Sequence, residues 1–140
     1  MPPNLEITHT CEFAAAHRLA APGLSAAQNA ACYGPCAREH GHTWTLEVTV
    51  SGPLDPSRGW VVDFAVLDRL VNERVVARVD HHHLNHEVTF LAGVIPTAEN
   101  LAIACWRELE PAVLAVPGCR LVRVAIGEDR RHLVVYRGDA

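Results

Sequence analysis

The chain has 140 residues, a length typical of one domain, and a formal charge of −4, so we expect residues 1–140 to form a single domain. Hydrophobic residues make up 49% and charged residues 20%, which is a globular composition and argues against disorder. The mild acidity and the lack of a basic stripe exclude a general nucleic-acid binder. All 12 basic residues are arginines, which excludes chemistry that needs a lysine.

Two further features concern the compartment. No apolar run is long enough to cross a membrane, and the N-terminus lacks the basic and apolar segments of a secretory signal. The five cysteines are odd in number and irregularly spaced. These features predict a cytoplasmic protein with reduced thiols and without a disulfide framework.

The first half of the chain predicts two strands. Residues 5–17 alternate between apolar and polar side chains, and residues 42–50 alternate again. Between them, residues 18–39 are small and turn-rich, which indicates a long loop with room for a short helix from Ser25.

The second half predicts two helices and two strands. Asp63 and Thr97 are each followed by apolar residues at helical spacing, so each is a predicted N-cap. The segment between these helices, residues 80–95, has no regular pattern. Two short strands, 120–127 and 132–137, are joined by a tight polar turn.

The predicted element order is therefore ββααββ. Strands that are segregated from helices indicate an α+β fold with both helices on one face of the sheet. Neither pair of consecutive strands has the long crossover that parallel pairing needs. We therefore expect a four-stranded antiparallel sheet.

Three histidines are candidate metal ligands. His40 and His42 lie two residues apart on a predicted strand, so their side chains point the same way. His17 ends the preceding strand, and an antiparallel hairpin would bring it beside them. Three imidazoles with a vacant fourth position form the arrangement of catalytic zinc sites.

Two cysteines precede this pair of histidines. Cys36 would be a fourth ligand in a closed structural site, or a base or nucleophile if a nearby cation lowers the thiol pKa. Cys32 competes with it for the role, and spacing alone leaves these readings open.

An aspartate and three histidines form the next candidate group. Asp80 precedes a run from His81 to His83, which is typical of a solvated or metal-scavenging patch. An aspartate beside a histidine can also orient the imidazole for proton transfer. The roles of His82 and His83 stay open.

Glu128 lies on the inward parity at the end of the strand 120–127 and needs a donor partner. That partner is either a nearby arginine (Arg123, Arg130 or Arg131) or a ligand with two parallel N–H groups. Thr97 and Glu99 at a helix start are interpreted first as a cap and a dipole partner.

Six short motifs occur in order along nearly the whole chain: Phe13-x-Ala15-Ala16-His17-Arg18-Leu19, Gly34-x-Cys36-x-x-x-His40-Gly41-His42, Gly59-Trp60-Val61-Val62-Asp63-Phe64, Asp80-His81-His82-x-Leu84-Asn85, Pro96-Thr97-Ala98-Glu99-Asn100 and Glu128…Tyr136-Arg137-Gly138. Any one motif is weak, but six in order are specific. In this set the chain resembles the 6-pyruvoyltetrahydropterin synthase / 6-carboxy-5,6,7,8-tetrahydropterin synthase family.

The resemblance implies a tunnelling fold (T-fold). Each subunit would give four antiparallel strands and two helices, and three subunits would close a barrel. Two trimers would stack into a hexamer, with active sites between subunits. The implied substrate is a small pterin, 7,8-dihydroneopterin triphosphate.

The resemblance also implies roles for particular residues. Zinc would be bound by His17, His40 and His42. Glu128 would anchor the pterin ring, and Thr97 and Glu99 would join that pocket. The remaining catalytic residues would be the base Cys36 and its assistants, Asp80 and His81.

The resemblance includes two branches of the family. The Cys36-x-x-x-His40 spacing resembles the carboxy-forming branch, whereas the loop from Leu24 to Gly34 resembles the pyruvoyl-forming branch, which has a longer gap after the cysteine. Gly127 stands where a larger residue is commoner. We favour the carboxy-forming lyase, which releases acetaldehyde and triphosphate and serves 7-deazaguanine or queuosine-type biosynthesis.

Two alternatives are kept beside this prediction. One is a 6-pyruvoyltetrahydropterin synthase, which eliminates triphosphate from the same substrate. The other belongs to a different class and is a non-catalytic zinc- or pterin-binding protein with the same fold.

Overall fold

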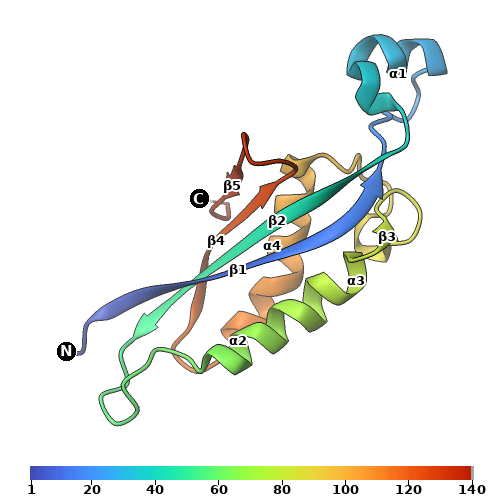
Figure 1. The fold of residues 1–140 in the computed structure, drawn as a ribbon. Coiled ribbons are helices and arrows are strands. Elements are labelled where there is room, and N and C mark those ends of the chain that lie inside the picture. Colours follow the sequence, from blue (N-terminus) through green and yellow to red (C-terminus); the bar gives the residue numbers. More distant parts are fainter. Residues whose placement is uncertain (140) are drawn as a thin grey trace.

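A computed structural model describes residues 1–139 as an α+β fold in which helices cover one face of a β-sheet (Figure 1). The sheet has five strands in the spatial order β3-β1-β2-β4-β5. Their bounds are β1 (Asn4–His17), β2 (His40–Pro53), β3 (His82–His83), β4 (Arg120–Gly127) and β5 (Val134–Tyr136).

The two longest strands form the predicted antiparallel hairpin. β1 pairs with β2 over their whole length, from Asn4 opposite Pro53 to His17 opposite His40. The alternation seen in the sequence places Phe13, Trp44 and the other apolar residues of these strands on the face that the helices cover. The register also sets the end of β1 beside the start of β2.

The sheet is mixed and five-stranded, so the prediction of four antiparallel strands was wrong in this respect. β3 lies in the segment that the sequence left irregular, and it pairs in parallel with Ala15 and Ala16 of β1. Two residues are too few to produce an alternating pattern. Their position is fixed by backbone bonds on either side, from His81 N–H to the Ala14 carbonyl and from Leu84 N–H to the Ala16 carbonyl.

Both predicted N-caps of the long helices are confirmed. α2 (Phe64–Val71) begins after Asp63, whose carboxylate accepts from the Ala65 N–H, and it continues through the π-helical turn η2 (Asn72–Val76) into α3 (Ala77–Val79). α4 (Ala98–Leu114) begins after Thr97. The π-helical turn leaves no signal in the apolar spacing and was not predicted.

Three shorter elements complete the fold. α1 (Ala26–Tyr33) is the short helix expected from Ser25, whose side chain caps it, and it is followed by the 3-10 turn η1 (Gly34–Ala37). α1 buries no residue and projects beyond the ends of β1 and β2 (Figure 1). A second 3-10 turn, η3 (Thr89–Leu91), precedes α4.

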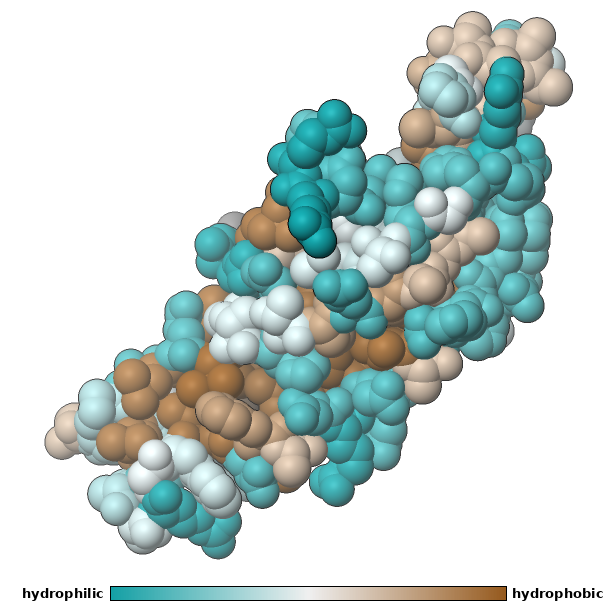
Figure 2. Space-filling view, in the orientation of Figure 1, coloured by the Kyte–Doolittle hydropathy of each residue, from teal (hydrophilic) through white to brown (hydrophobic). Residues whose placement is uncertain are grey.

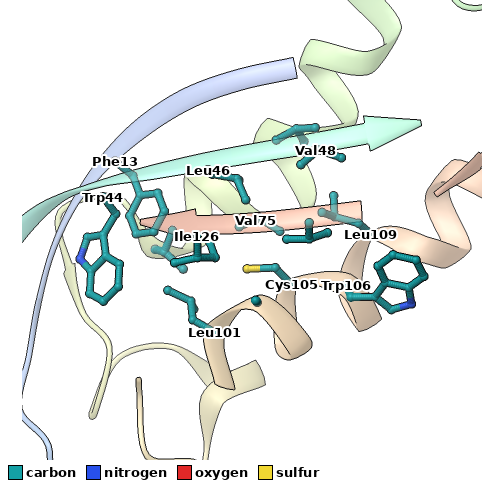
Figure 3. Close-up of a cluster of buried hydrophobic side chains, with 14 of the residues drawn as sticks. Phe13, Trp44, Leu46, Val48, Val75, Leu101, Cys105, Trp106, Leu109 and Ile126 are labelled. Carbon is teal, nitrogen blue, oxygen red and sulfur yellow. The ribbon is translucent and has the colours of Figure 1, made fainter. Parts of the chain in front are cut away.

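The core fills the space between the sheet and the helices (Figure 3). Leu46, Leu101 and Leu109 are fully buried there, and the Phe13 and Trp44 rings stack with centroids 5.9 Å apart. The Trp44 indole also donates a hydrogen bond to the Ala15 carbonyl across the hairpin. Trp44 therefore gives a rigid base to the strand ends where the histidines lie.

The surface differs between regions of the molecule. Figure 2 shows apolar surface toward the end of the sheet where the chain begins, whereas the turn between β4 and β5 is strongly hydrophilic. All five cysteines are free in the structure. Over residues 1–139, the helices are all too short or too polar to cross a bilayer.

Candidate active site and metal centre

Three histidines meet where β1 ends and β2 begins. His17 lies opposite His40 in the hairpin register, and His42 is on the same face two residues further on. One ring nitrogen from each lies within 4.8 Å of the other two. The structure therefore brings together the three predicted metal ligands, which we call the triad.

Hydrogen bonds fix the ring protons of two triad members. His17 Nδ1 lies 2.8 Å from the Pro96 carbonyl and His40 Nδ1 lies 2.6 Å from the Arg38 carbonyl. A carbonyl only accepts, so each Nδ1 must donate, and the proton of the neutral ring is then absent from Nε2. The Nε2 lone pairs of His17 and His40 are thus free to bind an electrophile.

Two Nε2 atoms of the triad are buried without a hydrogen-bond partner, those of His17 and His42. An unpartnered buried nitrogen is costly, and a metal ion would satisfy both. Burial also lowers the pKa of His17 to about 4, and the neighbouring imidazoles add to this effect against the opposing Pro96 hydrogen bond. At neutral pH the ring is therefore neutral, which is the form that binds metals.

A carboxylate lies beside the triad. Glu128 follows the last residue of β4, and its oxygens are 3.8 Å from His17 Nε2 and 4.0 Å from His42 Nε2. Within residues 1–139 these two histidines are its only ion-pair partners. Glu128 thus keeps acceptor capacity for a ligand.

Two of the three candidate arginine partners of Glu128 are engaged elsewhere, and within residues 1–139 the third, Arg130, forms no ion pair with it. Arg123 donates to Glu47 and Thr49, and Arg131 pairs with Asp129. The reading of Glu128 as a member of a structural ion pair with these arginines therefore has no support.

Close packing explains why a glycine occupies position 127. A Cβ at this position would lie 3.2 Å from the Asp129 carbonyl oxygen and 3.3 Å from that of His132, closer than most real Cβ contacts. Glycine thus lets the turn between β4 and β5 fold tightly against the end of β4. This turn holds the backbone next to Glu128.

Glu128 opens onto a cleft of about 680 Å³ that is also lined by Thr97, Glu99 and Leu19. The three predicted substrate-binding residues, which lie just after β4 and at the start of α4, thus lie together. Thr97 Oγ1 accepts from the Asn100 N–H at 3.1 Å, so its capping role is also confirmed.

The two candidate cysteines lie on different elements. Cys36 is half-buried in η1, and its carbonyl accepts from the N–H of Leu19, a residue of the cleft wall. Cys32 is exposed on α1. Among the described residues, the donor group of the triad contains no cysteine, so a closed site with Cys36 as fourth ligand is not supported.

The predicted pair of Asp80 and His81 is present. Asp80 accepts from the Ala14 N–H at 2.9 Å and lies 3.0 Å from His81 Nδ1, and these hydrogen bonds lower the pKa of Asp80. The His81 side chain is 81% exposed, so Asp80 is its main restraint.

His81 lines a different cavity from Glu128. This cavity of about 550 Å³ is lined by Ala14, Ala16 and Thr43, by the triad residue His42, and by His82 and His83. Within one chain, the structure does not bring Glu128 and His81 into one pocket.

The hydrogen-bond partners of the triad have no signal in the sequence. The carbonyls of Pro96 and Arg38 orient His17 and His40, but a backbone carbonyl leaves no side-chain signal. The sequence also did not indicate that His83 joins Glu39 and His86 in a second cluster of possible ligands.

Comparison with known proteins places this chain in a family. A family model described as 6-pyruvoyl tetrahydropterin synthase matches residues 6–139. The chain belongs to this family. The predicted resemblance is thus confirmed.

Relatives within the synthase family have names of two kinds. The 6-pyruvoyl tetrahydrobiopterin synthase of Poecilia reticulata is 36% identical over 135 residues, which cover 95% of this chain and 90% of that protein. A putative 6-carboxy-5,6,7,8-tetrahydropterin synthase of Archaeoglobus fulgidus is 41% identical over 107 residues, which cover 76% and 84%. The solved structure of Caenorhabditis elegans 6-pyruvoyl tetrahydropterin synthase has 33% identity and a TM-score of 0.90, covering 99% of this chain and 98% of that one.

Proposed function

We propose that the protein is a zinc-dependent tetrahydropterin synthase that acts on 7,8-dihydroneopterin triphosphate, with residues 1–140 as its one domain. The observation that carries the proposal is the triad itself, with two orphaned buried Nε2 atoms beside a carboxylate that has no arginine partner. Three histidines that leave one position open are typical of catalytic zinc. When bound, zinc would supply Lewis-acid chemistry at the side-chain hydroxyls of the substrate.

Glu128 is the proposed anchor for the pterin ring. Its two oxygens would accept hydrogen bonds from the ring amino group and the adjacent ring N–H, a charge-assisted bidentate contact. Thr97 and Glu99 share its cleft and would complete the ring pocket.

Proton transfers fall to Cys36 and His81. The Cys36 thiolate would remove a proton at a side-chain carbon of the substrate, and His81 would move a proton on the opposite side. Asp80 would hold His81 Nδ1, as it does in the structure at 3.0 Å. The substitution Glu128→Gln should weaken substrate binding, whereas Cys36→Ala should stop turnover.

A homo-oligomer would complete the site. His81 faces a cavity separate from the Glu128 cleft, which supports an active site made between subunits. The outer edge of β1 is paired by β3 at Ala15 and Ala16 alone, so the rest of this edge is open to another chain. We propose closure of the sheets of three chains into a barrel and a hexamer of two trimers. Sedimentation that shows a stable monomer at micromolar concentration would contradict it.

The favoured reaction is the carboxy-forming one, with release of acetaldehyde and triphosphate and a place in 7-deazaguanine or queuosine-type biosynthesis. Three residues separate Cys36 from His40, which resembles that branch. The second candidate is elimination of triphosphate to give 6-pyruvoyltetrahydropterin, and relatives of that name, which the chain matches over nearly its full length, favour it.

Product analysis distinguishes these reactions. Zinc-loaded protein is mixed with 7,8-dihydroneopterin triphosphate, with the Cys36→Ala variant as the blank. Acetaldehyde together with triphosphate supports the carboxy-forming reaction, and triphosphate without acetaldehyde supports the pyruvoyl-forming one. Zinc and pterin binding with no turnover would identify a non-catalytic binding protein and contradict both.

A further inference from the structure

We propose that Glu39, His83 and His86 form a second divalent-metal site, separate from the triad, for a transition metal of the zinc type. One ligand atom of each residue lies within 4.8 Å of the other two. The site shares no residue with the triad, and it does not depend on the function proposed above.

The three ligands come from segments that the fold holds in place. Glu39 immediately precedes β2, His83 belongs to β3, and His86 lies in the turn that follows β3 (Figure 1). His83 Nε2 is already hydrogen-bonded to a Glu39 carboxylate oxygen. The His83 and His86 rings are stacked, with centroids 4.4 Å apart.

The turn that carries both histidines is preorganised. The His83 carbonyl accepts from the N–H groups of His86, at 3.2 Å, and Glu87, at 2.9 Å. The Glu87 carboxylate in return accepts from the His83 N–H at 2.7 Å. Little chain entropy is therefore lost when an ion binds between the two rings and Glu39.

The donor set decides the class of ion. Two imidazoles and one carboxylate suit Zn²⁺, Co²⁺ and their neighbours, whereas Mg²⁺ and Ca²⁺ prefer oxygen ligands. The Glu39 side chain is 60% exposed and His86 is exposed, so an ion has direct access from solvent.

Two present contacts would change on binding. Arg18 Nε lies 3.5 Å from Glu39 and would give up this exposed ion pair. Metal at His83 Nε2 requires the ring proton on Nδ1, so the Asn85 N–H, now 3.2 Å from Nδ1, would lose its acceptor. The turn keeps its other hydrogen bonds, and the ion replaces the proton that His83 shares with Glu39.

The position of the site indicates what a bound ion would do. Glu39 is next to the triad residue His40, and β3 closely follows Asp80 and His81. An ion bound here would tie the start of β2 to the segment that carries this acid–base pair. It is a positioning device and not a second catalytic centre.

The test counts metal on the full-length protein. Metal-depleted wild type is titrated with Co²⁺, read by its absorption bands, and with Zn²⁺ in competition with a chromogenic chelator. We expect two equivalents per chain for each ion and no effect of Mg²⁺. His86→Ala should keep the first equivalent and bind the second at least about tenfold more weakly, the minimum cost of a lost supporting ligand.

Three further variants make the result decisive. Glu39→Gln keeps the side-chain shape and should show the same loss, and His42→Ala should lose the first equivalent but keep the second. His132→Ala, which removes an exposed histidine outside both groups, should bind two equivalents. A single wild-type equivalent that His42→Ala removes, two unchanged equivalents in His86→Ala, or loss of both equivalents in His42→Ala would each overturn the proposal.

Discussion

The triad and the Asp80–His81 pair both lie near the C-terminal end of β1, but their imidazole rings differ in burial and in hydrogen-bond partners. His17 is fully buried, and its Nδ1 is bound to a backbone carbonyl of the chain segment before α4. His81 is 81% exposed and is held mainly by the carboxylate of its neighbour Asp80. Burial and a carbonyl partner fix one tautomer of His17, whereas the His81 ring is open to solvent and contacts the Asp80 carboxylate.

This difference supports the different roles that we propose for His17 and His81. A metal ligand must be neutral, with a known nitrogen lone pair facing the ion. A proton carrier must change its charge near neutral pH and must reach solvent or substrate. The count of histidines in the sequence does not distinguish these cases, but their burial in the fold does.

The largest expected effect is loss of metal from the triad. His42→Ala removes one of three ligands, and we expect it to lose the tightly bound zinc equivalent, measured by elemental analysis after gel filtration. His132→Ala is the matched control, because it removes an exposed histidine of the β4–β5 turn and should keep full zinc content. If His42→Ala kept the tight equivalent and Cys36→Ala lost it, the closed structural site would be correct instead.

The second expected effect distinguishes the two cysteines. Cys36→Ala should lower turnover by roughly 10²–10⁴, the usual cost of losing a general base, with zinc retained. Cys32→Ala should stay within a few-fold of the wild type, because Cys32 is exposed on α1, which buries no residue. Steady-state rates and zinc content of both variants decide this, and equal losses at the two positions would point to a folding effect in the loop.

Much of this site followed from the sequence because its proposed metal ligands lie on regular strands. Alternation fixed the faces of β1 and β2, and the antiparallel hairpin then required His17 to meet His40. The predicted caps Asp63 and Thr97 are also correct, since capping is a local interaction. These are features in which neighbours along the chain decide the structure.

What the sequence did not predict depends on distant backbone groups. β3 is two residues long and is held by backbone bonds to β1, and the Pro96 carbonyl reaches His17 across 79 positions of the chain. The cluster of Glu39, His83 and His86 likewise joins two segments that are far apart in the sequence. Such contacts depend on the tertiary structure, and local sequence patterns do not report them.

The third prediction concerns the pH dependence of the metal-free protein. The pKa of His17 is about 4 in the folded state and near 6.5 in the unfolded state, so the unfolded chain binds more protons between these values. The free energy of unfolding should therefore fall as pH drops from about 6.5 to about 4, by about 3 kcal/mol in total.

Urea denaturation between pH 7.5 and 4.5 measures this slope. The carboxyl of Asp80 has a pKa below its usual 3.8, so it titrates mainly outside this window. His17→Gln should flatten the dependence, whereas His132→Ala should leave it in place. A wild-type slope that His17→Gln does not change would assign the effect to other groups.

The smallest expected effect is on stability at His81. Its φ of 61° makes it the one non-glycine residue with a left-handed backbone in the described chain. His81→Gly would relieve this strain, but the greater freedom of glycine in the unfolded chain opposes the gain, so the free energy of unfolding should change by less than about 1 kcal/mol. Turnover should fall, since the imidazole is gone. Asparagine also tolerates a left-handed backbone, so His81→Asn should show a similarly small change in the free energy of unfolding. Loss of several kcal/mol in either variant would show that His81, like His17, is part of the packed structure.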